Sequence, residues 1–67
     1  MELSVGFKFN VIGKDITGEI LSIGSVCGYA ICCVDFKRNN EHYISDCFID
    51  TIINNLKYGL YEEATNA

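Results

Sequence analysis

The stretch from Gly28 to Ile44 constrains the fold more than any other part of the chain. An apolar run rich in β-branched and aromatic residues, 28–36, is followed by the polar run 37–40 and then by a second alternating run, 41–44. This pattern is typical of a β-hairpin. Positions of both parities in the first arm are largely apolar. Both faces of that strand therefore need a cover, either from the rest of the chain or from a second protein.

The length of the chain limits how much cover it can supply. It has 67 residues, of which 49% are hydrophobic and none is proline. Because a chain of about 60 residues buries only about 60% of the surface that its unfolded form exposes, we expect a single domain, 1–67, with a small core. The net charge of −4 disfavours broad binding to phosphate backbones, which needs several basic residues on one surface.

Alternation of apolar and polar residues predicts four short strands, over 5–12, 16–23, 29–36 and 41–44. Residues 24–28, which begin and end with glycine, are expected to form a loop between the second and third strands. A change of parity around Gly18 indicates a bulge or a strong bend in the second strand. In the third strand, alternation assigns residues to two faces. One face carries Ala30, Cys32, Val34 and Phe36, and the other carries Tyr29, Ile31, Cys33 and Asp35.

The period of the pattern changes after the fourth strand. Ser45 or Asp46 can cap a helix, and Gly59 is a natural stop. Apolar residues follow the cap at helical spacing: Phe48, Ile49, Ile52, Ile53 and Leu56. We therefore expect a helix over 46–58 and a flexible tail over 62–67. The fold class is α+β: a β-meander over 5–44, forming a small, strongly bent antiparallel sheet or partly open barrel of about four strands, with a C-terminal α-helix.

Several strand motifs support the barrel form of this fold. They are Gly-Glu-Ile-Leu-x-Ile-Gly from Gly18, Tyr-x-Ile-x-x-Val-x-Phe from Tyr29, and a short strand that ends in Ile44-Ser45. Over about residues 5–45 the chain resembles small SH3-like or Tudor-type β-barrel modules. It departs from them where a fifth strand would follow, because an isoleucine-rich helix stands there instead. The resemblance implies a binding function rather than catalysis and names no ligand.

The four cysteines are expected to be reduced and buried as small hydrophobic residues. No Cys-x-x-Cys occurs, and Cys32 and Cys33 are adjacent, so on a strand they point to opposite faces and do not share a zinc site easily. The N-terminal residues have neither a basic start nor an apolar core, as a signal peptide would. No apolar run approaches the ~18 residues of a membrane span. These features favour a cytoplasmic protein without a membrane partner.

No catalytic motif stands out, so we expect a protein that is not an enzyme and that uses no metal or other cofactor. His42, Asp46 and Cys47 could be imagined as a nucleophilic cluster, but a histidine just after a turn is ordinarily an exposed strand residue. The glycines form no phosphate-binding pattern.

Protein binding is the function that these features favour. A single helix can cover only one face of the sheet, and an apolar face left open on a small protein usually marks an interface. The candidate contact residues are Tyr29, Ile31 and Cys33 on the third strand and Tyr58 and Tyr61 after the helix. The partner is either a second copy, giving a homodimer, or a larger target protein whose identity the sequence does not give. The size and composition are typical of phage or mobile-element accessory proteins that modulate a host protein.

The alternative function is nucleic-acid binding by an SH3-like barrel. Small barrels bind single strands through surface aromatics flanked by basic residues. Lys37 and Arg38 would be the nucleic-acid contacts in this alternative. The acidic net charge argues against it.

Overall fold

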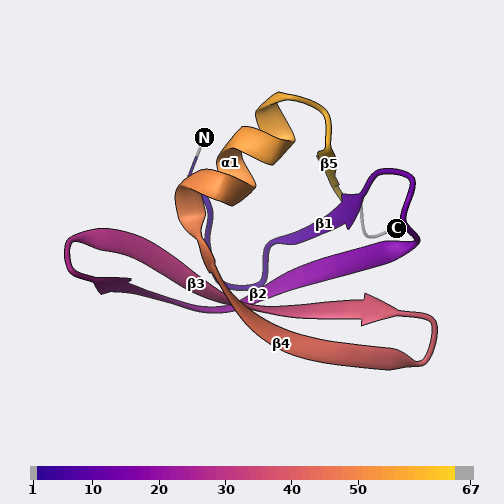
Figure 1. Ribbon diagram of the computed structural model, residues 1–67, viewed down its shortest axis with the longest axis horizontal. Coiled ribbons are helices and arrows are strands. Elements are labelled where there is room, and N and C mark those ends of the chain that lie inside the picture. The colour runs from indigo at the N-terminus through magenta and orange to yellow at the C-terminus, as the bar shows by residue number, and fades with distance from the viewer. Residues whose placement is uncertain (1, 65–67) are drawn as a thin grey trace.

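The computed structural model describes residues 2–64 and shows an open five-stranded antiparallel sheet with one helix on one face (Figure 1). The elements in chain order are β1 (Lys8–Val11), β2 (Ile16–Val26), β3 (Tyr29–Arg38), β4 (Glu41–Phe48), α1 (Ile49–Lys57) and β5 (Tyr61–Glu63). The order across the sheet is β4-β3-β2-β1-β5. Consecutive strands are neighbours from β1 to β4, as expected for a meander, and the fold is α+β.

Two hairpins make up most of the sheet, and both are longer than the sequence pattern indicated. The β2–β3 hairpin turns at Cys27 and Gly28, whose φ angles of 51° and 83° are the two positive values that a type I′ turn needs. The β3–β4 hairpin turns at Asn39, with φ of 56°, and Asn40. The expected loop over 24–28 is therefore a tight turn, because the pairing of Val26 with Tyr29 extends β2 and β3 to its edge.

The bulge in β2 lies at Leu21, where the register with β3 shifts between Ile20 and Ser22. Its expected position at Gly18 was wrong. Gly18 has a different role: it pairs with Phe9 of β1, and a Cβ at Gly18 would stand 2.4 Å from Cζ of that ring. The missing side chain at this position is what allows the Phe9 ring to lie flat against β2.

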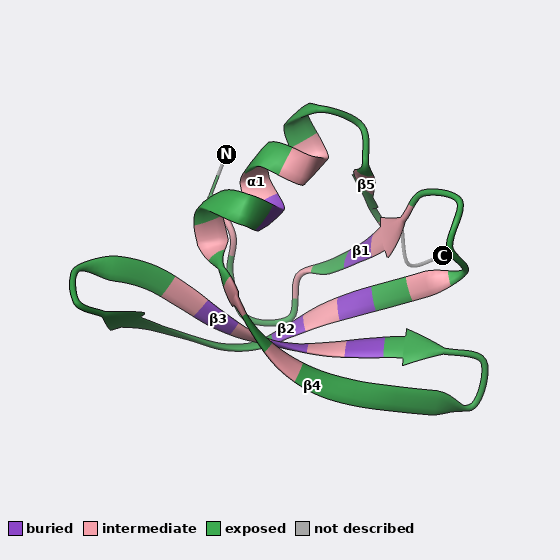
Figure 2. Cartoon of the chain, in the orientation of Figure 1, coloured by how far each residue is buried: buried purple, intermediate pink, exposed green. Residues whose placement is uncertain are grey.

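The core lies between α1 and the face of the sheet beneath it, here called the inner face. Its buried residues are Phe9, Ile20, Cys32, Val34, Phe36 and Ile52. Phe9 is fully buried, packs edge-on against Phe36 and stacks on Tyr61 with the ring centroids 4.7 Å apart. Buried residues gather where the strands pass under α1, and the hairpin ends are exposed (Figure 2). The predicted inner set of β3 is confirmed for Cys32, Val34 and Phe36, whereas Ala30 is exposed.

The helix is shorter at its start than the sequence indicated. It begins at Ile49, because residues 46–48 continue β4 and pair with β3. Phe48 is the N-cap residue and makes no side-chain capping hydrogen bond, so the expected cap at Ser45 or Asp46 was wrong. The C-terminal end agrees with the expectation. Gly59, with φ of 78°, follows the C-cap, and the amide of Leu60 donates to the carbonyl of Asn55, which completes a Schellman motif.

The chain does not end in the expected tail directly after Tyr61. Residues 61–63 form β5, which pairs with β1 at the edge of the sheet, and the amide of Ala64 donates to the carbonyl of Lys8. The remaining part of the expected tail, 65–67, lies outside the described residues. A fifth strand thus exists, but it comes after the helix, and the sheet stays open instead of closing into a barrel.

We predict that G18A is destabilised by about 2 kcal/mol or more, because the added methyl group clashes with the fully buried Phe9 ring. The matched control is G24A in the same strand, since nothing lies within 4 Å of a Cβ at Gly24 and its φ is not in the left-handed region. Chemical denaturation of both variants measures the difference. Equal stability of G18A and wild type would contradict the packing of Phe9 on Gly18.

We predict that I52D unfolds the domain, because Ile52 is 1% exposed beneath α1 and an unpaired carboxylate there has no partner. The loss would match the whole stability of a chain of this size, about 3–10 kcal/mol. T51D is the control, as Thr51 is exposed one position earlier in the helix. Far-UV circular dichroism at 20 °C distinguishes the two. A folded I52D would show that α1 does not cover the core.

Candidate functional site

The face of the sheet opposite α1, here called the outer face, carries the main candidate binding residues. Paired residues of antiparallel strands share a face. Because Cys32, Val34 and Phe36 point inward, the odd-numbered residues of β3 point outward. Tyr29, Ile31 and Cys33 therefore lie together on the outer face, as the alternation along the third strand predicts.

An apolar cluster occupies one end of the outer face. The cluster consists of Tyr29 and Ile31 of β3 and the residues that pair with them in the neighbouring strands. Val26 of β2 pairs with Tyr29, and Phe48 of β4 pairs with Ile31. Tyr29 is 64% exposed and Phe48 is 52% exposed, and their rings meet edge to face with centroids 5.9 Å apart. We call Val26, Tyr29, Ile31 and Phe48 the outer apolar patch. A shallow hollow of about 240 Å³ adjoins it, lined by Tyr29, Ala30, Phe48, Asp50 and Thr51.

Val26 and Phe48 belong to this patch but were not among the predicted contact residues. The sequence pattern places Val26 in the loop over 24–28 and Phe48 in the apolar stripe of the helix. The period-2 pattern of the fourth strand, if followed beyond Ile44 through Asp46 to Phe48, would have placed the phenylalanine on the face of Ile31. The helical pattern that begins at the same residues hid this signal.

The two tyrosines near the end of the helix do not join the patch. Tyr58 is the C-cap residue of α1 and is 70% exposed, with Nζ of Lys57 lying 5.6 Å from its ring centroid. Tyr61 is half-buried and stacks on Phe9 at the edge of the core. The structure thus separates Tyr58 and Tyr61 from the residues of β3, because α1 and the inner face lie on the other side of the sheet.

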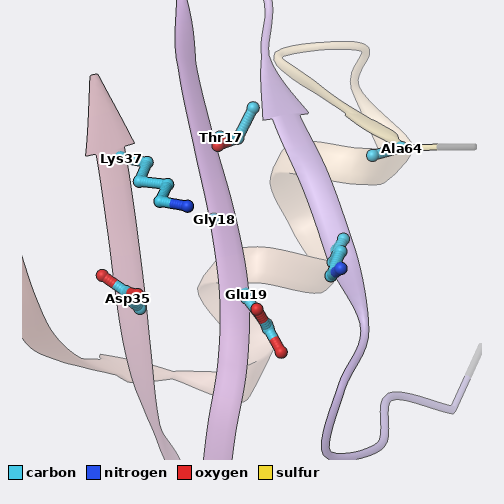
Figure 3. Close-up of a pocket in the computed structure, with 7 residues that line it drawn as sticks. Thr17, Gly18, Glu19, Asp35, Lys37 and Ala64 are labelled. Carbon is cyan, nitrogen blue, oxygen red and sulfur yellow. The ribbon is translucent and has the colours of Figure 1, made fainter. Parts of the chain in front are cut away.

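A polar region lies farther along the outer face, where β1, β2 and β3 run side by side. A hollow of about 200 Å³ is lined there by Lys8, Thr17, Gly18, Glu19, Asp35, Lys37 and Ala64 (Figure 3). Its two lysines and two carboxylates are equal in number, so their formal charges offset one another. Both hollows are smaller than the roughly 300 Å³ of a typical small-molecule site, and neither contains a histidine or cysteine.

His42 and Asp35 form a hydrogen-bonded pair beside this polar region. Nδ1 of His42 lies 3.0 Å from Oδ1 of Asp35, and the histidine side chain is 59% exposed. A carboxylate only accepts hydrogen bonds, so Nδ1 is the donor. Cys47, which the sequence placed in an imagined cluster with His42, points to the inner face with its partner Cys32, whereas His42 lies on the outer face with Lys37. The nucleophilic cluster is therefore not assembled.

Lys37 and Arg38 are consecutive in β3, so their side chains leave the sheet on opposite faces. Lys37 lies in the polar region next to Asp35, and Arg38 pairs with Glu41 at the end of the hairpin. The two residues proposed for nucleic-acid contact do not form one basic surface.

The cysteines differ in their surroundings. All four are free thiols. Burial raises the pKa of Cys32 above its ordinary value, with a further rise from Cys47, and burial followed by the charge of Asp46 raises the pKa of Cys47. Cys27, at the tip of the β2–β3 hairpin, is exposed, so the expectation that all four are buried was wrong for this residue. Among residues 2–64, no group of three metal-binding side chains comes together.

The chain matches no protein-family model, no curated protein and no solved structure. The resemblance to SH3-like modules therefore stays a prediction. Within the described range 2–64, no helix is long and apolar enough to cross a membrane.

We predict that a thiol reagent modifies Cys27 of the native protein first and Cys32 only after unfolding. Cys27 is exposed, while Cys32 is 1% exposed and its pKa is raised, which lowers the fraction of reactive thiolate. Mass spectrometry of digests from a time course with iodoacetamide at pH 8 measures the order. The C27S variant, which should resist early labelling, is the control. Native modification of Cys32 as fast as Cys27 would contradict the described core.

Proposed function

We propose that this chain is a non-enzymatic protein-binding module and that the outer apolar patch is its contact surface. The observation that carries the proposal is the exposure of two aromatic rings, Tyr29 and Phe48, which pack on each other on the face that α1 leaves open. Val26, next to Tyr29 in register, is 57% exposed. Soluble monomers rarely expose contiguous apolar patches, and such patches usually mark interaction sites.

The chemistry of the patch suits a protein partner. Aromatic residues are enriched at protein interfaces, because they bury a large apolar area while few rotatable bonds are fixed. The edge-to-face contact with Phe48 holds the Tyr29 ring before any partner arrives. Less conformational entropy is therefore lost on binding, and the gain in affinity is correspondingly larger. The phenol oxygen gives the surface one polar group for orientation.

Other functions find less support in the geometry. The hollows are small, His42 and Cys47 lie on opposite faces, and the lysines of the polar region stand beside Glu19 and Asp35. A nucleic-acid ligand needs several cations on one surface, and Lys37 and Arg38 diverge. The proposed partner is a protein of the cell in which the chain is made, and a phage or mobile-element origin stays an expectation drawn from size and composition.

We predict that Y29A weakens capture of the partner by about tenfold or more, because an exposed aromatic anchor at the centre of a patch carries a large share of the binding energy. The bait is the full chain incubated with a lysate of its native host, and the captured protein is identified by mass spectrometry and then titrated in purified form. Y58A is the matched control, since Tyr58 is at least as exposed, 70% against 64%, and stands away from the patch.

The two variants give distinct results. Loss of binding in Y29A with full binding in Y58A supports the proposal. Equal binding in Y29A and wild type would refute the outer apolar patch as the contact surface. A captured nucleic acid, whose affinity falls steeply with salt and depends on Lys37, would refute protein binding altogether.

A further inference from the structure

The edge of β4 is the longest unpaired strand edge of the described residues. β4 pairs only with β3 and runs for eight residues. Most of its residues are exposed, and its register with β3 has no shift. Proteins usually protect such an edge by shortening it or by placing lysine, proline or a bulge in it. β4 contains no lysine, proline or bulge, although Glu41 and Asp46 are charged, and it is much longer than the opposite edge, β5, which has three residues.

The free backbone groups of this edge belong to the residues of one parity. The β3–β4 hairpin has a two-residue loop, and in such a hairpin the flanking pair, here Arg38 and Glu41, is hydrogen-bonded. Because hydrogen-bonded and non-hydrogen-bonded pairs alternate, the amides and carbonyls of His42, Ile44 and Asp46 point away from β3. No other backbone hydrogen bond is formed by these residues. The side chains of the same residues lie on the outer face.

We propose that this edge pairs with the β4 edge of a second copy of the chain, antiparallel and with Ile44 opposite Ile44 of the partner subunit. The two sheets then join into one continuous sheet around a twofold axis. This interaction surface consists of backbone groups of the β4 edge, whereas the outer apolar patch consists of side chains. An experiment can therefore refute the dimer without refuting the binding of a different protein, and the reverse.

When His42 is in its imidazolium form, charge complementarity selects this register among the alternatives. With Ile44 on the axis, His42 stands opposite Asp46 of the partner subunit, and Asp46 stands opposite the partner's His42. A shift of the pairing by two residues, which is the smallest that keeps the faces aligned, places Asp46 opposite the partner's Ile44, or His42 opposite the partner's Ile44. A larger shift brings Asp46 opposite its own copy. Cross-strand pairs of opposite charge stabilise a sheet and like pairs destabilise it.

The side chains at the proposed contact are available in the monomer. Ile44 is 55% exposed, the His42 side chain is 59% exposed, and Asp46 is exposed. The charged groups that face His42 within its own subunit are Asp35, at 3.0 Å, and Lys37, its partner in register. In the neutral ring with Nδ1 donating to Asp35, Nε2 carries no proton and cannot donate to the carboxylate of the partner's Asp46. The imidazolium form, in which both ring nitrogens donate, satisfies both carboxylates.

We expect a dimer with about twice the monomer mass of 7.5 kDa in sedimentation equilibrium or light scattering. Strand pairing alone buries little surface, so the expected dissociation constant is on the order of 10 µM. Measurements up to about 500 µM thus cover both species. A protein that stays monomeric across this range would overturn the proposal.

The variant I44K tests the position of the axis. It brings two lysines together across the twofold axis and should weaken the dimer by about tenfold or more. I12K is the matched control, because Ile12 is similarly exposed, 47% against 55%, and lies outside β4. Circular dichroism confirms that both variants are folded. An undiminished dimer in I44K, or an equal loss in I12K, would overturn the β4 interface.

A charge swap tests the register. The H42E homodimer sets the introduced glutamate opposite the partner's Asp46, and the D46K homodimer removes the carboxylate that faces the partner's His42 and sets a lysine there, so each should dissociate. In a mixture of the two variants, a heterodimer should form. The introduced glutamate of H42E then faces the introduced lysine of D46K, and Asp46 of H42E faces His42 of D46K. Within its own subunit the introduced glutamate stands beside Asp35 as well as Lys37, so circular dichroism first confirms that H42E is folded. Native mass spectrometry measures the composition. Homodimers that persist in both variants, or a mixture without heterodimers, would overturn this register.

Discussion

The contact between Phe9 and the bare backbone at Gly18 is the constraint on which the rest of this fold depends. Phe9 is fully buried in the short strand β1, and its ring occupies the place that a side chain at Gly18 would fill. From that position it touches Phe36 from β3 and Tyr61 from β5. One ring thus joins the long hairpins to the C-terminal strand. A chain with six buried core residues has few other contacts that could do the same.

The small core explains why one face of the sheet stays open. α1 has one strongly buried residue, Ile52, and packs against β3, β4 and β5 on the inner face only. No second helix or sheet covers the outer face in the described chain. Cross-strand packing partly shields Ile31 and Cys33, whereas the residues towards the hairpin end, Val26 and Tyr29, are more exposed. The outer apolar patch is therefore a consequence of having a single helix, which packs on the inner face.

The proposed partner binding and the proposed dimer depend on different groups of the same sheet. The outer apolar patch offers side chains that lose water on contact, and the β4 edge offers backbone groups that have no partner within the sheet. Burial of side chains gives affinity for a surface of matching shape. Backbone pairing, together with the facing side chains of His42 and Asp46, fixes the orientation of the second copy. In the proposed dimer the outer faces of both copies would continue into each other, so a partner protein would meet two patches on one surface.

Local signals in the sequence were enough for the hairpins, for the inward face of Cys32, Val34 and Phe36, and for the end of the helix at Gly59, because turn residues and periodicity act within a few positions. Only the tertiary structure decided that β4 runs to Phe48, that the bulge lies at Leu21, and that residues 61–63 pair with β1. Each of these depends on a contact between segments far apart in the chain. For the same reason the pairing of Val26 and Phe48 with the residues of β3 was hidden: at Phe48 the strand and helix periods overlap, and the choice between them is made by hydrogen bonds to another strand.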